Sequence, residues 1–124
     1  MNPQFGGPGA CSGVAKPLVN LQAHSAALGL TFYSGKQFPA DYRGDLFVAF
    51  HGSIYRTVPT GYKVVRIHFT NGQPGQVQDF AAGRLPGADS AWGRPVDVIT
   101  AADGSLFLSD DFGGIIYRIF YVGG

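Results

Sequence analysis

Short runs of apolar and β-branched residues, each bounded by Gly, Pro, Asn or Asp, make up most of the chain. Runs of this length with such boundaries predict strands, and no segment carries a convincing helical period. The expected strands are residues 16–22, 28–33, 45–51, 62–69, 77–81, 95–100, 106–110 and 115–122. Asn71-Gly72 predicts a hairpin turn between two of them. The sequence therefore predicts an all-β fold.

An internal repeat divides these strands into two units. Gly-Asp-Leu-Phe-Val at 44–48 resembles Gly-Ser-Leu-Phe-Leu at 104–108, and residues 62–69 resemble residues 114–121. The two matches have different offsets, which a longer loop between the second and third strands of the first unit explains. Units of three or four short antiparallel strands at this period are typical of β-propeller blades. A β-sandwich would give similar strands without the duplication, so it is the second choice.

The repeat and the local composition predict the organisation of the chain. Residues 1–15 are rich in Gly and Pro and are expected to form a flexible tail. Residues 16–124 are expected to form two propeller blades. Within them, 16–22 would be a closing strand, 23–83 the first blade, and 84–124 a second blade that lacks its outer strand.

The composition narrows the function classes. Only 14% of the 124 residues are charged, and the acidic residues are all Asp, which disfavours a helical bundle. The net charge of +1 comes without a basic run, so a nucleic-acid partner is not expected. A lone Cys11 excludes a disulfide within the chain and a cysteine-based zinc site. No apolar run has the length of a membrane span, and residues 1–13 lack the features of a signal peptide.

Several linked motifs cover nearly all of the chain past the tail. They occur at residues 23–35, 38–39, 42–45, 51–53, 59–66, 92–98, 103–106, 109–111 and 116–119. Together they resemble the glucose and sorbosone dehydrogenase family that depends on pyrroloquinoline quinone (PQQ). Two departures stand out: the family's His-Gly-Pro-Arg-Gly-Gly-like segment has no counterpart, and Ile54-Tyr55 replaces the expected Trp-Asn.

This resemblance implies a fold and a chemistry. The chain would correspond to the last two or so blades of a six-bladed β-propeller. Such propellers oxidise sugars or sugar aldehydes with PQQ, which calcium holds near the central channel. A periplasmic or secreted location is implied as well.

A pair of blades is expected to associate with further copies. Each blade packs on a neighbour, so two blades alone would expose two apolar faces. The order of one strand, then four, then three matches a propeller that closes by giving its first strand to the last blade. Because three chains would supply six blades, we expect a homotrimer with head-to-tail contacts.

The residue just before each unit is a candidate for chemistry. His24 matches a family His associated with cofactor and substrate, and its imidazole suits removal of a hydroxyl proton as hydride leaves. The alternative interpretation is a loop His that caps a strand end. Arg94 holds the equivalent position in the second unit, where its guanidinium would suit a quinone carboxylate. The alternative is an Arg that pairs with Asp97 or with backbone carbonyls.

Further polar residues follow the second strand of each unit. His51 and Arg56 are candidates for binding the cofactor on the same face, and the alternative is two loop residues in solvent. Asp110-Asp111 would suit a hard cation, but the pair lacks the spaced ligands of a calcium loop. We therefore expect these carboxylates to accept backbone hydrogen bonds, and we predict no metal ligand.

Two functions follow from these residues. The first is a PQQ-dependent sugar dehydrogenase with His24 as base and calcium as the associated ion. The second is a non-catalytic blade module that assembles into a ring and acts as a scaffold or binds a small sugar or anion.

His68 is expected to face solvent or a neighbour, and the aromatic residues Trp92, Tyr117 and Phe120 are expected to pack blades rather than to bind sugar.

Overall fold

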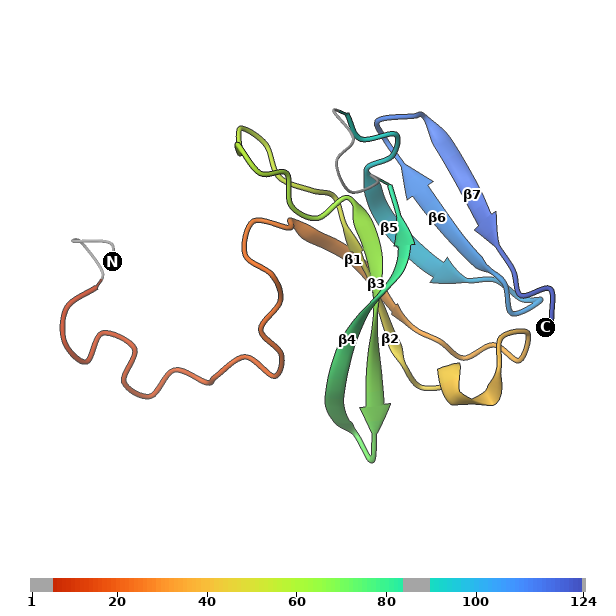
Figure 1. Cartoon of the computed structure of the whole chain (residues 1–124). Coiled ribbons are helices and arrows are strands. Elements are labelled where there is room, and N and C mark those ends of the chain that lie inside the picture. The colour runs from red at the N-terminus through yellow and green to blue at the C-terminus, as the bar shows by residue number, and fades with distance from the viewer. Residues whose placement is uncertain (1–5, 84–89, 124) are drawn as a thin grey trace.

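A computed structural model describes residues 6–83 and 90–123, which form two antiparallel sheets (Figure 1). The first sheet, called blade 1 below, has four strands in sequence order: β1 (Ala27–Phe32), β2 (Leu46–Phe50), β3 (Lys63–Thr70) and β4 (Gln73–Ala82). The second sheet, blade 2, has three strands: β5 (Pro95–Thr100), β6 (Leu106–Asp110) and β7 (Ile115–Ile119). A single 3₁₀ turn, η1 (Ala40–Tyr42), lies between β1 and β2. The all-β prediction is confirmed.

The two blades share the same construction, as the repeat predicted. In each blade the first strand carries a bulge near its start, between Ala27 and Leu30 in β1 and between Pro95 and Asp97 in β5. The loop between the second and third strands is longer in blade 1, as expected. Asn71 and Gly72 have φ angles of 53° and 74°, which confirms the predicted hairpin.

The strand boundaries differ from the prediction in three places. β4 begins at Gln73 rather than at residue 77, because the tight hairpin at Asn71-Gly72 pairs Thr70 with Gln73 and lets the ladder start at once. β7 ends at Ile119, where its partner β6 begins and offers no further residue for pairing. Residues 16–22, the predicted closing strand, form no strand within the single chain, and their pairing with a neighbouring copy stays a prediction.

Residues 16–22 run as an irregular segment away from the sheet edges (Figure 1). Pro17 lacks an N–H for a ladder, and no described strand of the chain pairs with the segment. Val19 and Leu21 instead pack on one face of blade 1, against Val48 and Phe50. The first part of the predicted tail, residues 1–5, and the start of the predicted second blade, residues 84–89, lie outside the described residues.

The core lies between the two blades. Phe47, Ala49 and Val64 of blade 1 are fully buried against blade 2, where the buried side chains are Val98, Leu106 and Leu108. The buried Tyr33 hydroxyl fastens this contact, because it donates to the Gly104 carbonyl oxygen at 2.7 Å and accepts from the Phe38 amide at 3.0 Å. The loop after β1 therefore holds blade 2 in place.

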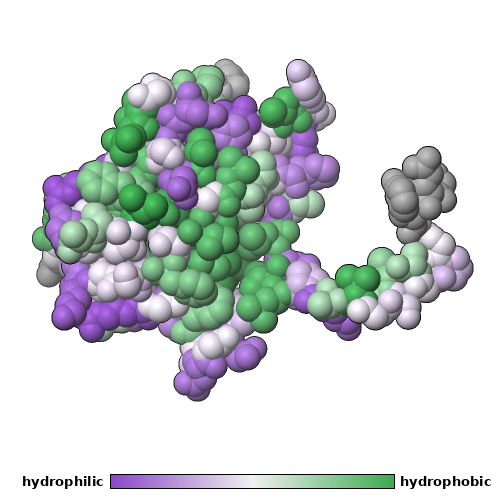
Figure 2. All heavy atoms as spheres, turned by 180° about the vertical axis from the view of Figure 1, so that it is seen from behind, coloured by the Kyte–Doolittle hydropathy of each residue, from purple (hydrophilic) through white to green (hydrophobic). Residues whose placement is uncertain are grey.

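The first strands of the two blades touch each other. A Cβ on Gly29 of β1 would lie 2.6 Å from the Asp97 Cα of β5, so this position requires glycine. Seen from behind, the folded part also carries a broad apolar patch at its surface (Figure 2). Among the described residues, no helix is long and apolar enough to cross a membrane.

Candidate functional site

One end of the blade pair collects most of the residues predicted for the site. Antiparallel pairing places the start of β1 beside the end of β2, and the start of β5 beside the end of β6. His24 precedes β1, His51 follows β2, Arg94 precedes β5 and Asp111 follows β6. We call this end of the two sheets the site end.

A hydrogen-bonded chain of three side chains crosses from blade 1 to blade 2 at the site end. Arg94 Nε lies 3.2 Å from the His51 carbonyl oxygen, and Arg94 Nη2 lies 3.0 Å from the Gly52 carbonyl oxygen. The same Nη2 is 3.3 Å from His51 Nδ1, and His51 Nε2 is 2.9 Å from Asp111 Oδ1. Arg94 therefore binds backbone carbonyls, as its alternative interpretation held. A contact between Arg94 and a quinone stays a prediction.

The network assigns the proton of the His51 ring. A guanidinium can only donate, so His51 Nδ1 accepts from Arg94 and the ring proton lies on Nε2, where it is donated to Asp111. The hydrogen bond from His51 lowers the pKa of Asp111 below its usual value, and the charge of Arg94 acts in the same direction. Since both ring nitrogens are engaged, His51 orients its neighbours rather than serving as a free base.

The turn that carries His24 is attached to this network through the backbone. The His51 amide donates to the Ala26 carbonyl oxygen at 3.0 Å, and the Gly52 amide donates to the Ser25 carbonyl oxygen at 2.9 Å. His24 itself has a φ of 64° and an exposed side chain that makes no hydrogen bond to any described residue. Its imidazole is thus accessible, and its role as a base stays a prediction.

Tyr62 supports the network and was missed by the sequence analysis. The Arg94 guanidinium carbon lies 5.3 Å from the centre of the Tyr62 ring, and the Tyr62 hydroxyl donates to the Ser53 carbonyl oxygen. A Cβ on Gly52, which has a φ of 97°, would lie 2.6 Å from the same ring. Tyr62 belongs to the family-like motif at residues 59–66, which could have drawn attention to it. The position of the Tyr62 ring under Arg94, however, depends on how the two blades pack.

Arg56 and the Asp pair behave differently from the rest of the site. Arg56 lies in the exposed part of the loop after β2 and makes no contact to the described residues of the network, so the structure does not bring it to Arg94. Asp110 Oδ1 accepts from the Gly113 amide at 2.9 Å, as expected for a structural carboxylate. In the described ranges no three His, Cys, Asp or Glu side chains group in a way that would hold a metal ion.

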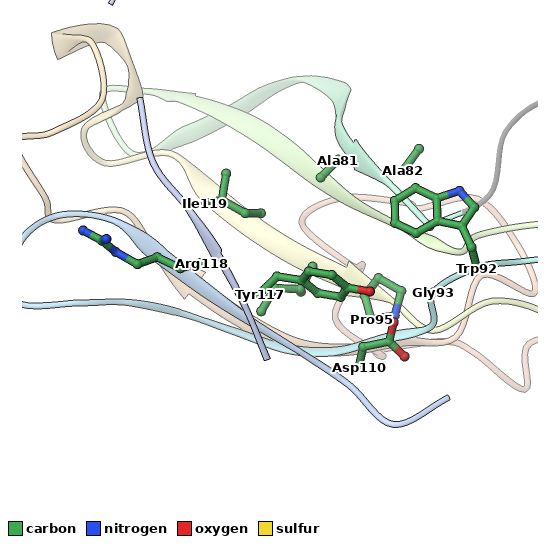
Figure 3. A pocket seen from close by; sticks show the side chains of 11 residues that line it. Ala81, Ala82, Trp92, Gly93, Pro95, Asp110, Tyr117, Arg118 and Ile119 are labelled. Atoms are coloured by element: carbon green, nitrogen blue, oxygen red, sulfur yellow. The ribbon is translucent and has the colours of Figure 1, made fainter. Parts of the chain in front are cut away.

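A cavity of about 220 Å³ lies between β4 of blade 1 and β7 of blade 2 (Figure 3). Its walls are mainly apolar, with Ala81, Trp92, Tyr117 and Ile119 among the lining residues. Asp110 also lines it, and its buried Oδ2 has no hydrogen-bond partner in the part of the chain that is described.

The three predicted packing aromatics have different environments. Tyr117 packs against the core, as expected. Trp92 and Phe120 are half exposed in this chain, so their packing between blades stays a prediction. Trp92 lines the cavity between the two blades, and Phe120 lies beyond the end of β7, where the Arg118 guanidinium lies over its ring.

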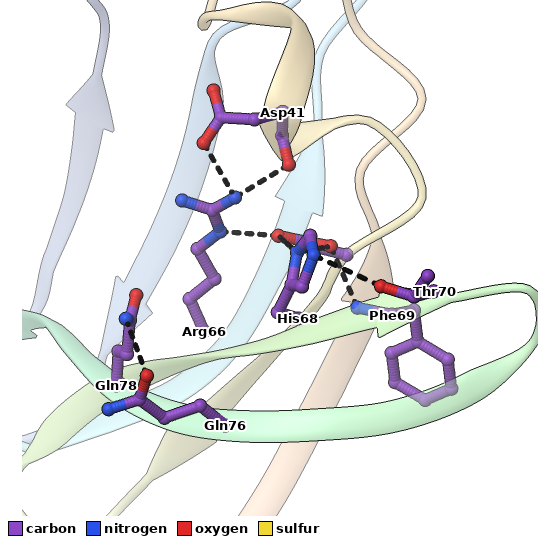
Figure 4. Close-up of polar contacts among 8 residues, drawn as sticks. Asp41, Arg66, His68, Phe69, Thr70, Gln76 and Gln78 are labelled. Carbon is purple, nitrogen blue, oxygen red and sulfur yellow. Dashed lines mark hydrogen bonds and ion pairs between the residues drawn. The ribbon is translucent and has the colours of Figure 1, made fainter.

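A second polar cluster lies at the opposite end of blade 1 (Figure 4). The fully buried Asp45 carboxylate accepts from Arg66 Nε, from the Phe69 amide at 3.0 Å and from His68 Nδ1 at 3.0 Å. Arg66 also binds the Asp41 carboxylate at 3.0 Å. Burial raises the pKa of Asp45, but the bonds from Phe69, Arg66 and His68 outweigh it and hold that pKa below its usual value. His68 was expected to face solvent or a neighbour, and its side chain does both: it is about half exposed, and its Nδ1 binds Asp45.

Comparison with known proteins identifies the family. The TrAA12-like family model matches residues 8–121. The chain belongs to the TrAA12-like family. An uncharacterized protein of Borreliella burgdorferi is 42% identical to this TrAA12-like chain over 106 residues, which cover 84% of the chain and 28% of that protein. A pyrroloquinoline quinone-dependent pyranose dehydrogenase of Coprinopsis cinerea is 31% identical over 123 residues, covering 84% of the chain and 16% of that protein.

Solved structures give the same relationship. The calcium structure of a Trichoderma reesei carbohydrate-active enzyme of family AA12 has a TM-score of 0.72 and 27% identity, over 90% of this TrAA12-like chain and 28% of that chain. The holo form of the PQQ domain of Coprinopsis cinerea pyranose dehydrogenase has a TM-score of 0.62 and 29% identity, over 79% and 27%. The chain thus spans less than a third of these relatives. The resemblance to PQQ-dependent sugar dehydrogenases is confirmed, and no finding tests the narrower match to sorbosone dehydrogenases.

Proposed function

We propose that the site end of this TrAA12-like chain forms one wall of a PQQ-dependent sugar dehydrogenase site. The observation that carries the proposal is the Asp111–His51–Arg94 network, which is joined through the backbone to the turn that bears His24. It brings an accessible imidazole and an oriented guanidinium to the same end of two blades. The family and the named activity of the Coprinopsis relatives support the same chemistry.

Each residue of the site has one task in this proposal. His24 accepts the proton of the sugar hydroxyl that is oxidised, while the bound quinone supplies the acceptor for the two electrons that leave as hydride. Arg94 presents a positive charge to an anionic group of the quinone, and His51 with Tyr62 fixes the guanidinium in place. Calcium has no ligand set among the described residues, so no step of the proposal depends on an ion held by them.

Binding of PQQ tests the role of Arg94. Trp92 is the single tryptophan of the chain and lies close to Arg94 in sequence, so its fluorescence reports quinone binding. We expect Arg94→Ala to weaken PQQ binding by about tenfold or more, as for a lost charged hydrogen bond. Arg43→Ala removes the same charge from an exposed position outside the network and is the matched control. Equal affinities for the two variants, or no binding by the natural chain, contradict the proposal.

Oxidation of pyranoses tests the role of His24. The chain is assayed with PQQ, calcium and a redox dye, with and without His24→Ala. We expect kcat to fall by about a hundredfold or more, with unchanged PQQ affinity, because only the proton acceptor is removed. Arg56→Ala is measured in parallel and decides whether that exposed Arg contributes to cofactor binding.

The second candidate function is a non-catalytic blade module that binds a small sugar or an anion. The fixed guanidinium of Arg94 supports it as well, because a positioned positive charge can bind an anion without any redox chemistry. Binding of PQQ or of a sugar, without turnover above the His24→Ala background, would support this function over the dehydrogenase.

A further inference from the structure

Each blade has two faces, and only one face of each packs on the other blade. We call the face of Phe47 and its equivalent Phe107 the leading face, and the face of Val48 and its equivalent Leu108 the trailing face. Successive residues of a strand point to opposite faces, so both blades follow this division. Inside the chain, the leading face of blade 1 packs on the trailing face of blade 2. On the trailing face of blade 1, Val19 and Leu21 cover the central strands and leave the first strand open, and the leading face of blade 2 has no such partner among the described residues.

Equivalent residues show how far these two faces are uncovered. Val98 pairs with Leu108 as Leu30 pairs with Val48, yet Val98 is 1% exposed and Leu30 is 57% exposed. On the other side of each blade, Val64 pairs with Ala49 as Ile116 pairs with Ser109. Val64 is fully buried, whereas Ile116 is 71% exposed. The sequence thus keeps large apolar side chains at positions that are interior in one blade and open in the other.

The open positions are clustered along the strands. Leu28, Leu30 and Phe32 alternate along β1 and are each about half exposed. On the leading face of blade 2, Ile99 of β5 and Ile116 of β7 are exposed to a similar or greater degree. Isolated exposed apolar residues are ordinary, but sets that line one sheet face mark interaction surfaces.

We infer that the two open faces pack on each other between copies of this chain, head to tail. Blade 2 of one copy would lie on blade 1 of the next as blade 1 lies on blade 2 within each copy. The occupant is a second copy because the chain already contains both halves of this contact and shows that they fit. A head-to-tail contact of this kind closes into a ring when the rotation per copy allows it.

The size of one contact favours a closed ring over an open pair. A four-stranded face with strands of five or six residues measures about 19 Å by 18 Å, on the order of 350 Å². Two such faces bury on the order of 700 Å² of flat area, below the roughly 1,200 Å² at which stable interfaces begin. A ring uses both faces of every copy and so doubles the area buried per copy. With six blades, as the sequence leads us to expect, the ring has three copies.

The segment 16–22 is compatible with this packing. Val19 and Leu21 now cover part of the trailing face of blade 1, where the neighbouring copy would lie. β7 ends the three-stranded sheet with one edge that no described strand pairs. On assembly the segment would leave its face and add to β7 of the adjacent copy as the missing outer strand. Pro17 suits such an edge position.

Light scattering coupled to size exclusion tests the inference on the 124-residue chain. We expect three times the chain mass of 13.1 kDa, with dissociation on dilution. Leu30→Lys disrupts the trailing face and Ile116→Lys the leading face, and each variant should run as a monomer. Val58→Lys changes an exposed apolar residue of the loop after β2, outside both faces, and should assemble normally. Circular dichroism confirms that each variant is folded, as expected for substitutions at exposed positions.

Mixing the two monomeric variants gives the decisive result. Leu30→Lys keeps an intact leading face and Ile116→Lys an intact trailing face, so at high concentration they should form one-to-one pairs and nothing larger. A contact between like faces, or general stickiness, predicts no such pairing. A natural chain that stays monomeric at every concentration, with its faces open to an apolar dye or to another partner, overturns the inference. Unchanged assembly of either lysine variant does the same.

Discussion

The two polar clusters of this protein lie at opposite ends of blade 1 and differ in construction. The Asp111–His51–Arg94 network at the site end crosses from one blade to the other, and its Asp111 is exposed. The cluster around Asp45 and Arg66 stays within blade 1, and its central carboxylate is fully buried. One joins two units and faces outward, whereas the other is enclosed in a single unit.

The internal repeat shows what the difference means. In blade 2, Arg118 occupies the position of Arg66 and binds Ser105, the equivalent of Asp45, and Asp103. A cluster that recurs in both blades belongs to the construction of a blade. The site-end network has no second copy, because the strand register aligns Arg94 with Ala26, and not with His24 as the sequence led us to expect. A polar network that the repeat does not require is the better candidate for function, and four experiments test this division.

The largest effect is expected from Asp45→Ala. This change leaves the buried guanidinium of Arg66 without its main partner and the Phe69 amide without an acceptor. We expect the free energy of unfolding in urea to fall by about 3 kcal/mol or more. The control is Asp79→Ala, which removes an exposed carboxylate paired with Lys63 and should cost less than about 1 kcal/mol. Similar losses for the two variants would show that the Asp45 cluster does not stabilise the blade.

The second-largest effect is expected from acid, which should reduce the stability that the Asp45 cluster contributes. The pKa of Asp45 is lower in the folded chain than its usual value, so its contribution is present above about pH 4 and is lost as pH falls through the folded pKa. Hydrogen bonds from Ser105, with help from Arg118, lower the pKa of Asp103 to about 2, which places its loss in the same acid range. Melting temperatures from pH 7 to 2 should drop below pH 4. Asp45→Asn should flatten part of that drop, and an identical profile would contradict the assignment.

A smaller effect is expected from Ser105→Ala in blade 2. Ser105 is buried and accepts from Arg118 Nε at 3.2 Å, but Arg118 is half exposed and keeps Asp103. We expect the free energy of unfolding in urea to fall by about 1 kcal/mol, which is the typical net contribution of one hydrogen bond. If Ser105→Ala lowered the free energy of unfolding as much as Asp45→Ala does, the charge of Asp45 would not be the source of the stability of the blade 1 cluster.

The smallest effect on stability is expected at the site end. His51→Ala removes a link between side chains that are partly open to solvent, so the free energy of unfolding should change by less than about 1 kcal/mol. The pKa of Asp111, followed by carboxyl carbon NMR, should rise toward its usual value, because the hydrogen bond from His51 is what lowers it. Without that rise, the network would not exist in solution.

Much of the fold follows from the local sequence. Runs such as those of β5 and β6 match their predicted boundaries because β-branched and apolar residues end at Gly, Asp or Pro. The segment 16–22 has a similar composition but forms no strand in the single chain, since it lies on a face of blade 1 and not along a sheet edge. Arg94 and His51 were singled out by their positions, but their contact depends on how blade 2 is set on blade 1. Tyr62 was missed for the same reason.

The sequence by itself determined that this protein is built from two repeated antiparallel sheets, because alternation, turn residues and the repeat are local properties. It also placed His24, His51 and Arg94 at the ends of strands. Only the tertiary structure decided which of these side chains meet and which cluster is enclosed. It also decided which blade faces are left open, because each of these depends on contacts between residues distant in the chain. The two units share one pattern, and their burial differs because only one face of each packs on the other blade.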